Sequence, residues 1–144
     1  MKIRAARSDD LDAIKALLAE NELPVADVDA DLLVAFLVAE DVSGRIVGSV
    51  GLERFGRGAL LRSLAIARKA QNEGLGTRLL DHAELMARAS DVSALWLLTT
   101  TAAGFFRRTG YADVERGTAS AEVQASRQFA ELCPTSAVCL TKRL

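Results

Sequence analysis

The sequence has few side chains suited to metal binding or covalent chemistry. Cys133 and Cys139 are its only cysteines, and His82 is its only histidine. Two thiols and one imidazole at this spacing match no zinc site, so we expect no bound metal. We expect both cysteines to be reduced and buried as small apolar side chains. His82 falls on a largely apolar helix, and we expect it to be a packed core residue rather than a catalyst.

Proline is scarce, and long apolar runs and an excess of one charge are missing. Two prolines and a hydrophobic content of 50% predict one globular domain over residues 1–144. A formal charge of −1, with acids and bases interspersed, indicates no basic segment that would bind nucleic acid or an anionic membrane. The longest apolar run, residues 32–39, is too short to cross a bilayer. Residues 1–7 lack the apolar core of a signal peptide, so we expect a cytoplasmic protein.

A strand, a glycine-containing turn and a helix follow one another in the middle of the chain. Residues 59–67 form an apolar run of strand length, and residues 77–87 carry apolar side chains at helical spacing. The turn between them reads Gln71-Asn72-Glu73-Gly74-Leu75-Gly76-Thr77. It would place free backbone N–H groups at a helix N-terminus, where they can bind a phosphate, although ordinary strand-to-helix connections contain glycines too. No Lys-Ser/Thr pair and no third glycine follow, so it is neither a P-loop nor a dinucleotide fingerprint.

The other apolar patterns predict strands and helices on both sides of this unit. Residues 25–33 and 117–130 are less regular, and we expect the first of these segments to shape a substrate entrance. The order fits a mixed α/β (α+β) domain in which one twisted sheet is flanked by helices. The predicted elements are strands at 1–6, 36–40, 46–55, 94–100, 111–115 and 137–141, and helices at 11–21, 77–90 and 102–109.

Two stretches resemble signatures of one enzyme family. Gln71-x-x-Gly74-x-Gly76 resembles the pyrophosphate-binding motif of the GNAT N-acetyltransferases, and residues 99–111 resemble their Asn-x-x-Ala-x-x-Phe-Tyr-x-x-x-Gly-Phe signature. The resemblance implies a GNAT-like fold, acetyl-CoA as co-substrate and direct transfer of the acetyl group to an amine. Thr99 stands at the usual Asn, and Phe106 stands where a general-acid Tyr is often proposed. Tyr111 would be the nearest replacement for that hydroxyl.

A closer similarity concerns the acceptor. Residues 36–39, 50–55, 61–65, 95–102 and 132–137 are similar to the arsenic-resistance-associated N-acetyltransferases that acetylate arsinothricin and are related to phosphinothricin acetyltransferases. This similarity implies acetylation of the α-amine of a small anionic amino-acid analogue. The alternatives are another small-molecule or peptide amine, or a CoA-binding module without catalysis. A homodimer is a further expectation, through the apolar C-terminal strand and residues 117–136.

The resemblance also gives candidate residues for acetyl-CoA and for catalysis. The N–H groups of Leu64 and Ile66 would stabilise the oxyanion, because the family splays this strand from its neighbour. Glu53 is the candidate base, acting through water, because only a neutral amine attacks. The alternative for Glu53 is a solvated carboxylate paired with Arg54 or Arg62. The expected acetyl-CoA contacts are Leu64, Ala65, Ile66, Gln71, Asn72, Glu73, Gly74, Leu75, Gly76, Thr77, Thr99 and Phe106.

Arg54, Arg62, Ser63 and Thr100 are the candidate substrate-binding residues. Arg62 interrupts an apolar strand, and a buried guanidinium without a partner is costly. It therefore meets an internal carboxylate or awaits a substrate anion. We favour the anion, because arsinothricin-like molecules carry a carboxylate and a second anionic head. Arg54 is a weaker candidate of the same kind, and the hydroxyls of Ser63 and Thr100 could hydrogen-bond the substrate.

Overall fold

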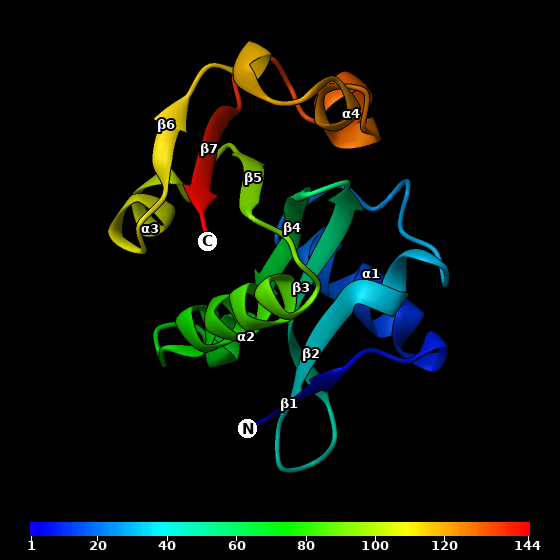
Figure 1. Ribbon diagram of the computed structural model, residues 1–144. Coiled ribbons are helices and arrows are strands. Elements are labelled where there is room, and N and C mark those ends of the chain that lie inside the picture. The colour runs from blue at the N-terminus through cyan, green and yellow to red at the C-terminus, as the bar shows by residue number, and fades with distance from the viewer.

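Seven stretches rich in apolar and β-branched residues pair into one sheet (Figure 1). The computed structural model describes all residues, 1–144. Its strand order is β1-β2-β3-β4-β5-β7-β6, and every neighbouring pair is antiparallel except β4 and β5. The predicted mixed sheet is therefore confirmed. The strands are β1 Lys2–Ala5, β2 Phe36–Glu40, β3 Ile46–Phe55, β4 Gly58–Ile66, β5 Ala94–Thr99, β6 Ala112–Val114 and β7 Val138–Arg143.

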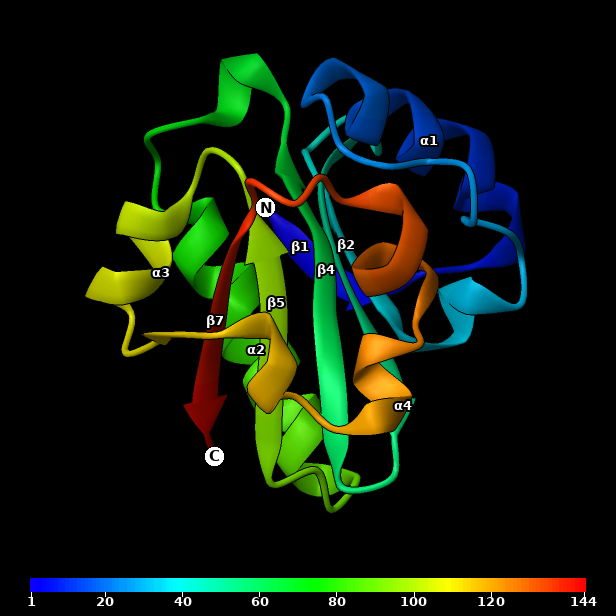
Figure 2. The same cartoon turned by 90° about the horizontal axis from the view of Figure 1, so that it is seen from above.

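Helices cover both faces of the sheet. Figure 2 shows α1 and α4 on one side of the strands and α2 and α3 on the other. None of these helices is both long and apolar enough to span a membrane. The α-helices are α1 Leu11–Glu20, α2 Leu75–Ala89, α3 Ala103–Arg108 and α4 Ala121–Gln124. Short 3₁₀ helices lie at Ser8–Asp10, Leu32–Ala35, Arg68–Ala70 and Arg116–Thr118, and a π-helical turn lies at Gln128–Leu132.

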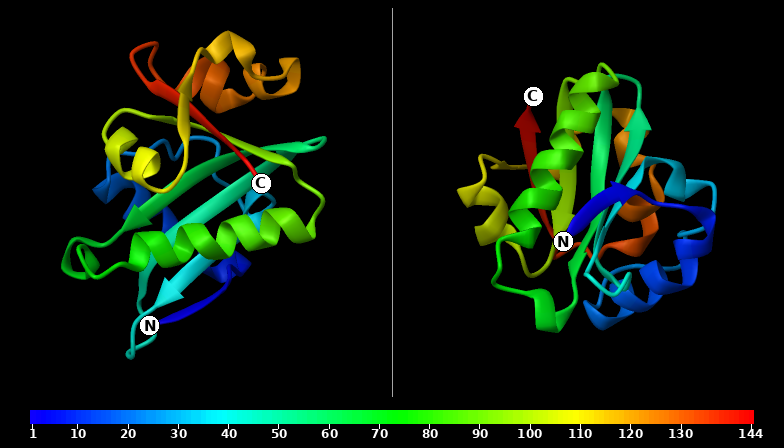
Figure 3. Two further views of the ribbon diagram at one scale, coloured as in Figure 1. Left: turned by 60° about the vertical axis from the view of Figure 1, so that its left-hand side comes forward. Right: turned by 90° about the horizontal axis from the view of Figure 1, so that it is seen from below.

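The apolar side chains form one large core and two smaller ones. The large core lies under α2, which runs along β2, β3 and β4 (Figure 3), and Leu79 and Leu80 of α2 are fully buried in it. On the opposite face, one small core packs α1 against the sheet and another packs α4 against Leu60. These two small cores are separate, so the stretch of sheet between α1 and α4 can carry polar groups.

The chain departs from regular strand geometry where β4 turns away from β5. The two strands pair only at Gly58–Leu60 with Ala94–Trp96, although β4 continues to Ile66. In the same part of β4 the register with β3 shifts, and Ser63 has a φ of +58°. The Ser49 hydroxyl donates a hydrogen bond to the carbonyl oxygen of Ser63 at 2.7 Å. This bulge bends β4, as bulges do, and opens a gap between β4 and β5.

Two expectations about packing were wrong. His82 is exposed on α2 and its Nδ1 lies 2.8 Å from the carbonyl oxygen of Arg78, because α2 turns its other face to the core. The C-terminal strand β7 pairs with β5 on one side and β6 on the other, so it has no free edge for a second copy of the chain. Cys139 is buried as expected, whereas Cys133 is half-buried.

Candidate functional site

Three adjoining cavities follow the gap between β4 and β5. The first, which we call the cradle, has a volume of about 660 Å³ and lies at the N-terminus of α2. The second, the passage, has a volume of about 160 Å³ and shares Thr101 and Ala102 with the cradle. The third, the side cavity, has a volume of about 450 Å³ and shares Arg62, Ser63 and Thr99 with the passage. A ligand that enters from the cradle therefore reaches the side cavity along the splayed strands.

The cradle is built for an anion by its backbone. Gly74 has a φ of +79° and directly precedes α2, so the chain can turn sharply into the helix. The N–H groups of Leu75, Gly76 and Thr77 have no hydrogen-bond partner, and no side chain caps them. Free donors at the positive end of a helix dipole are suited to a phosphate.

One side-chain charge in the cradle was missed at the sequence level. Arg108 of α3 lines the cradle and forms no ion pair, whereas its neighbour Arg107 is paired with Asp113 at 2.7 Å. Arg108 lies one helical turn after Gly104, which also lines the cradle. Residues four positions apart share a helix face, so this spacing could have indicated that Arg108 faces the cradle.

Most of the predicted turn residues line the cradle. Gln71 does so and also orders the loop, because its Nε2 donates to the carbonyl oxygen of Ile66 at 3.2 Å. Glu73 is exposed and lines none of the three cavities, so the geometry of the cradle does not support it as an acetyl-CoA contact. The predicted residues found in the lining are Ile66, Gln71, Asn72, Gly74, Leu75, Gly76 and Thr77.

The ladder between β3 and β4 decides which backbone groups face the gap. The N–H of Ala67 donates to the carbonyl oxygen of Val47 at 2.8 Å, and hydrogen-bonded pairs alternate along an antiparallel ladder. Ala65, opposite Ser49, therefore turns its N–H toward β3, while Leu64 and Ile66 turn theirs toward the gap. The side chain of Ala65 is also buried and lines none of the three cavities, so the geometry does not support Ala65 as an acetyl-CoA contact.

The passage contains no phenolic hydroxyl. Phe106 lines it and packs edge-on against Phe105 and Tyr111, with ring centroids 5.1 and 5.4 Å away. Tyr111 lines none of the three cavities, and its hydroxyl donates to Glu84 Oε2 at 2.9 Å. Burial and the charge of Glu84 raise the pKa of Tyr111 far above its usual value. Tyr111 therefore offers no hydroxyl to the passage in place of the missing acid.

Thr99 and Thr100 lie at the end of β5 beside the side cavity. The Thr99 Oγ1 accepts a hydrogen bond from the N–H of Ala102 at 2.9 Å, so this hydroxyl shapes the entry into α3. Thr100 lines the side cavity, as do Ser63, Gln128 and Cys133. Burial raises the pKa of the Cys133 thiol, so its thiolate is disfavoured.

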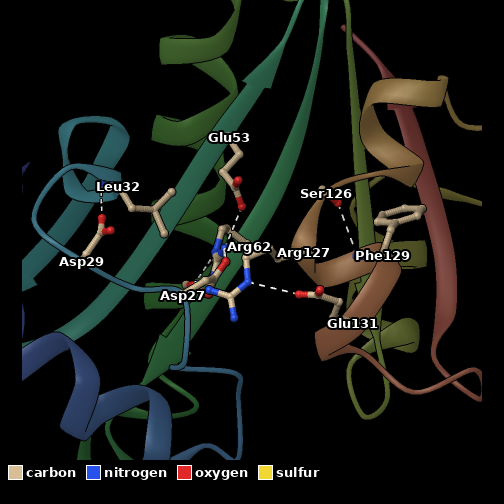
Figure 4. Close-up of polar contacts among 10 residues, drawn as sticks. Asp27, Asp29, Leu32, Glu53, Arg62, Ser126, Arg127, Phe129 and Glu131 are labelled. Carbon is tan, nitrogen blue, oxygen red and sulfur yellow. Dashed lines mark hydrogen bonds and ion pairs between the residues drawn. The ribbon is translucent and has the colours of Figure 1, made fainter.

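Arg62 lies in the middle of a network of ionised groups between α1 and α4 (Figure 4). Its guanidinium nitrogens donate to Asp27 Oδ1 at 2.7 Å and to Glu53 Oε1 at 2.6 Å, and also to Asp27 Oδ2. Its Nε donates to the Ser63 hydroxyl at 3.1 Å. Burial alone would lower the pKa of Arg62, but the two carboxylates outweigh burial and raise it. Arg62 is thus a fully ionised, fully buried side chain that already has partners.

This network corrects the preferred interpretation of Arg62. Arg62 meets internal carboxylates instead of awaiting a substrate anion, as the cost of burying an unpaired charge requires. Glu53, correspondingly, is paired with Arg62 and does not line the side cavity. Arg54 lies at the far end of β3, where its Nε donates to the carbonyl oxygen of Gly56 at 2.8 Å, and it lines none of the three cavities. The geometry of the site therefore does not support Arg54 as a substrate-binding residue.

The sequence that forms this fold and this gap matches the model of a known protein family. The family model described as an acetyltransferase (GNAT) domain matches residues 33–113. This match spans more than half of the chain, which therefore belongs to the GNAT acetyltransferase family. Residues 71–76 and 99–111, whose signatures carried the resemblance, both lie entirely within the match.

The chain is also similar to individual proteins. An uncharacterised N-acetyltransferase of Chlorobaculum tepidum is 33% identical over 82 residues, which cover 56% of this chain and 52% of the relative. N-acetylglutamate synthase of Neisseria gonorrhoeae, solved with coenzyme A and N-acetyl-glutamate, has a TM-score of 0.86 and is 24% identical over 99% of this chain. That match covers 35% of the synthase chain. A Mycobacterium tuberculosis protein solved with CoA has a TM-score of 0.84 and is 23% identical, over 100% of this chain and 99% of its own. The chain thus spans about half of the Chlorobaculum protein and about a third of the synthase.

Proposed function

We propose that this chain is an acetyl-CoA-dependent N-acetyltransferase that acts on a small-molecule amine. The observation that carries the proposal is the gap between β4 and β5, along which the cradle, the passage and the side cavity adjoin one another. Family membership supports it, as does the presence of CoA in the two structural relatives named above. The free N–H groups at the start of α2 and the unpaired Arg108 fit the pyrophosphate of CoA.

In the proposed reaction the splayed strand supplies electrostatic stabilisation. Bound acetyl-CoA provides the acetyl group as a thioester, whose carbonyl carbon a neutral amine attacks as the carbon–sulfur bond breaks and CoA leaves. The N–H groups of Leu64 and Ile66 face the gap and would donate to the carbonyl oxygen as its negative charge grows. Phe106 and the other apolar walls of the passage exclude water from this point.

We propose Glu53 as the acceptor of the amine proton, through an intervening water. One of its oxygens is held by Arg62, the other has no partner within the chain, and the side chain is 22% exposed, so water can reach it. Replacing Glu53 by Gln should then lower kcat about 100-fold, the lower range for loss of a general base. The KM for acetyl-CoA should stay unchanged. A kcat within threefold of wild type would remove Glu53 from the mechanism.

For the acceptor we propose a small amino-acid analogue of the arsinothricin or phosphinothricin type. The resemblance of five sequence blocks supports this acceptor, and a side cavity of about 450 Å³ suits a small molecule better than a peptide. Because Arg62 is already paired, the anionic groups of such a substrate would bind to neutral donors such as Ser63, Thr100 and Gln128. The role would be arsenic and antibiotic resistance in the cytoplasm.

Release of CoA from acetyl-CoA with a panel of amines tests both levels of this proposal. The panel holds arsinothricin, phosphinothricin, glutamate, a polyamine, an aminoglycoside and an N-terminal peptide. Turnover confined to the first two compounds would support the detoxification role. Turnover of another amine would keep the enzyme and reject that acceptor. Acetyl-CoA binding without any turnover would favour a non-catalytic CoA-binding module.

The proposed homodimer would have to use residues 117–136, because β7 is enclosed between β5 and β6. None of the exposed large apolar side chains lies in that segment. Light scattering coupled to size exclusion decides between a mass of 15.4 kDa for one chain and twice that mass.

A further inference from the structure

One wall of the side cavity is a segment without helix or strand. Residues 22–26 follow α1 and contribute five consecutive lining residues, Glu22, Leu23, Pro24, Val25 and Ala26. We call residues 22–26 the strap. The strap packs Leu23 and Val25 partly against the α1 core, and the first of its lining residues has a φ of +57°. Apart from this packing, polar contacts lie at both ends of the strap.

Both ends of the strap are bonded to the same strand. Just before the strap, the side-chain Nδ2 of Asn21 donates a hydrogen bond to the carbonyl oxygen of Ile66 on β4 at 3.3 Å. After it, Asp27 accepts hydrogen bonds from both terminal guanidinium nitrogens of Arg62, also on β4. β4 is the strand that turns the N–H groups of Leu64 and Ile66 to the gap. The strap is thereby fixed to the element that carries the proposed reaction centre.

The two anchors differ in kind. The Asn21 contact is one long, neutral hydrogen bond, whereas the Asp27 contact is a bidentate ion pair whose side chains are 8% and 0% exposed. Burial alone would raise the pKa of Asp27, but Arg62 outweighs burial and lowers it, so this carboxylate stays ionised. Arg62 keeps Glu53 as a partner when Asp27 is neutralised, so the strap can be released while Arg62 stays paired.

From this arrangement we infer that Asp27 is a positioning residue that holds the strap across the side cavity through Arg62, and that the strap sets the affinity for the acceptor amine. The second part rests on the proposed function, because it takes the side cavity as the acceptor site. The first part does not depend on any activity.

Hydrogen exchange on the protein without ligand tests the first part. The amides of Leu23 and Val28 are the reporters, because they donate to the carbonyl oxygens of Leu18 and Val25. Asp27→Asn should speed their exchange at least about tenfold, since bonds between charged groups are worth more than neutral ones. The matched control is Asp29→Asn, which removes one charge from an exposed carboxylate whose only bond is to the N–H of Leu32. Glu53→Gln, which loosens Arg62 from the other side, should leave both amides unchanged.

Unchanged exchange in Asp27→Asn would overturn the proposal, and so would an equal acceleration in the core of α2, which reports general destabilisation. If Asp27→Asn does not fold, Asp27→Glu keeps the charge but alters the bidentate geometry, and it should give a smaller acceleration at the same two amides. No acceleration there would overturn the proposal as well.

Kinetics with the amine found in the panel test the second part. Asp27→Asn should raise the KM for the amine at least fivefold while the KM for acetyl-CoA stays within twofold, and Asp29→Asn should change neither. Faster exchange with an unchanged amine KM would overturn the link to affinity. If no amine is turned over, the proposed function fails. The hydrogen-exchange experiment still tests the first part of the proposal, because it needs no activity.

Discussion

Whether an arginine can bind a ligand depends on the carboxylates that it already meets. Arg62 is surrounded by Asp27 and Glu53, and Arg107 is paired with Asp113 on the surface. Arg108 differs from both, because it forms no ion pair and lines the cradle. An unpaired guanidinium beside free helix N–H groups can give its hydrogen bonds to phosphate oxygens, so Arg108 is the side chain whose removal should affect acetyl-CoA most directly.

We predict that Arg108→Ala raises the KM for acetyl-CoA about tenfold and leaves the KM for the amine unchanged. A hydrogen bond to a charged group contributes about 1.5 to 3 kcal/mol, and about 1.4 kcal/mol corresponds to a factor of ten. Steady-state kinetics with each substrate varied in turn make the measurement. Arg107→Ala is the matched control, because it removes the same charge from the neighbouring position, where Arg107 forms an ion pair with Asp113. Equal effects of the two substitutions would show that general charge, rather than the cradle contact, attracts the cofactor.

The sequence showed the local parts of the site and missed the contacts between distant parts. The turn at residues 71–77 and the strand end at Leu64 and Ile66 are continuous in the chain, so their pattern could be read directly. The pairing of Arg62 with Glu53 was one of the alternatives that the sequence offered, but its pairing with Asp27 could not be read, because Asp27 is 35 residues away in a segment with no regular period. The interpretation of Arg62 as a substrate ligand failed for this reason, because the fold decides which carboxylate an arginine meets.

At the scale of elements, the pairing of β2 with β3 depends on one missing side chain. Gly51 lies opposite Phe36 in the register, and Phe36 is 1% exposed. A Cβ added at Gly51 would lie 2.1 Å from Cε1 of the Phe36 ring. The ring packs over the glycine, so this position tolerates no side chain unless Phe36 leaves the α1 core.

We predict that Gly51→Ala lowers the free energy of unfolding by about 3 kcal/mol, the upper range for overpacking in a core. Urea unfolding followed by circular dichroism measures it. Gly117→Ala provides the control, because a Cβ there meets no atom within 4 Å and φ is not positive, so this change should be neutral or slightly stabilising. A loss of less than about 1 kcal/mol in Gly51→Ala would mean that the Phe36 ring repacks freely.

Most helices and strands could be predicted, because each shows its own local periodicity of apolar residues. The hairpin of β2 and β3, the helix α2 and the strand β5 appear close to their predicted bounds. The bulge at Ser63 was not predictable, because a serine with positive φ carries no glycine signal. The place of β7 was not predictable either, since strand order depends on long-range pairing that the local pattern does not contain.

At the scale of the whole molecule, two buried carboxylates tie distant segments to the sheet. Asp10, just before α1, accepts two hydrogen bonds from Arg4 of β1, and Arg4 also pairs with Glu40 of β2. Asp27 ties the strap to β4 in the same way. The hydrogen bonds from Arg4 lower the pKa of Asp10, and Arg62 lowers that of Asp27 against the opposing effect of burial. Both carboxylates thus bind a proton more weakly in the folded protein than in the unfolded chain.

This difference predicts a loss of stability in acid. Above the ordinary carboxyl pKa of 3.8 both states are ionised and the full contribution is present. As the pH falls below that value, these two carboxylates become protonated in the unfolded chain while they stay ionised in the folded protein. The free energy of unfolding therefore decreases until the pH has passed the lower pKa values of the folded protein. Urea unfolding at pH 6 and at pH 3 measures the drop. Asp27→Asn and Asp10→Asn should each make the drop smaller than in wild type, whereas Asp29→Asn, whose carboxylate forms no ion pair, should leave it as it is. A drop of wild-type size in Asp27→Asn would mean that the ion pair with Arg62 adds nothing to the acid sensitivity of the fold.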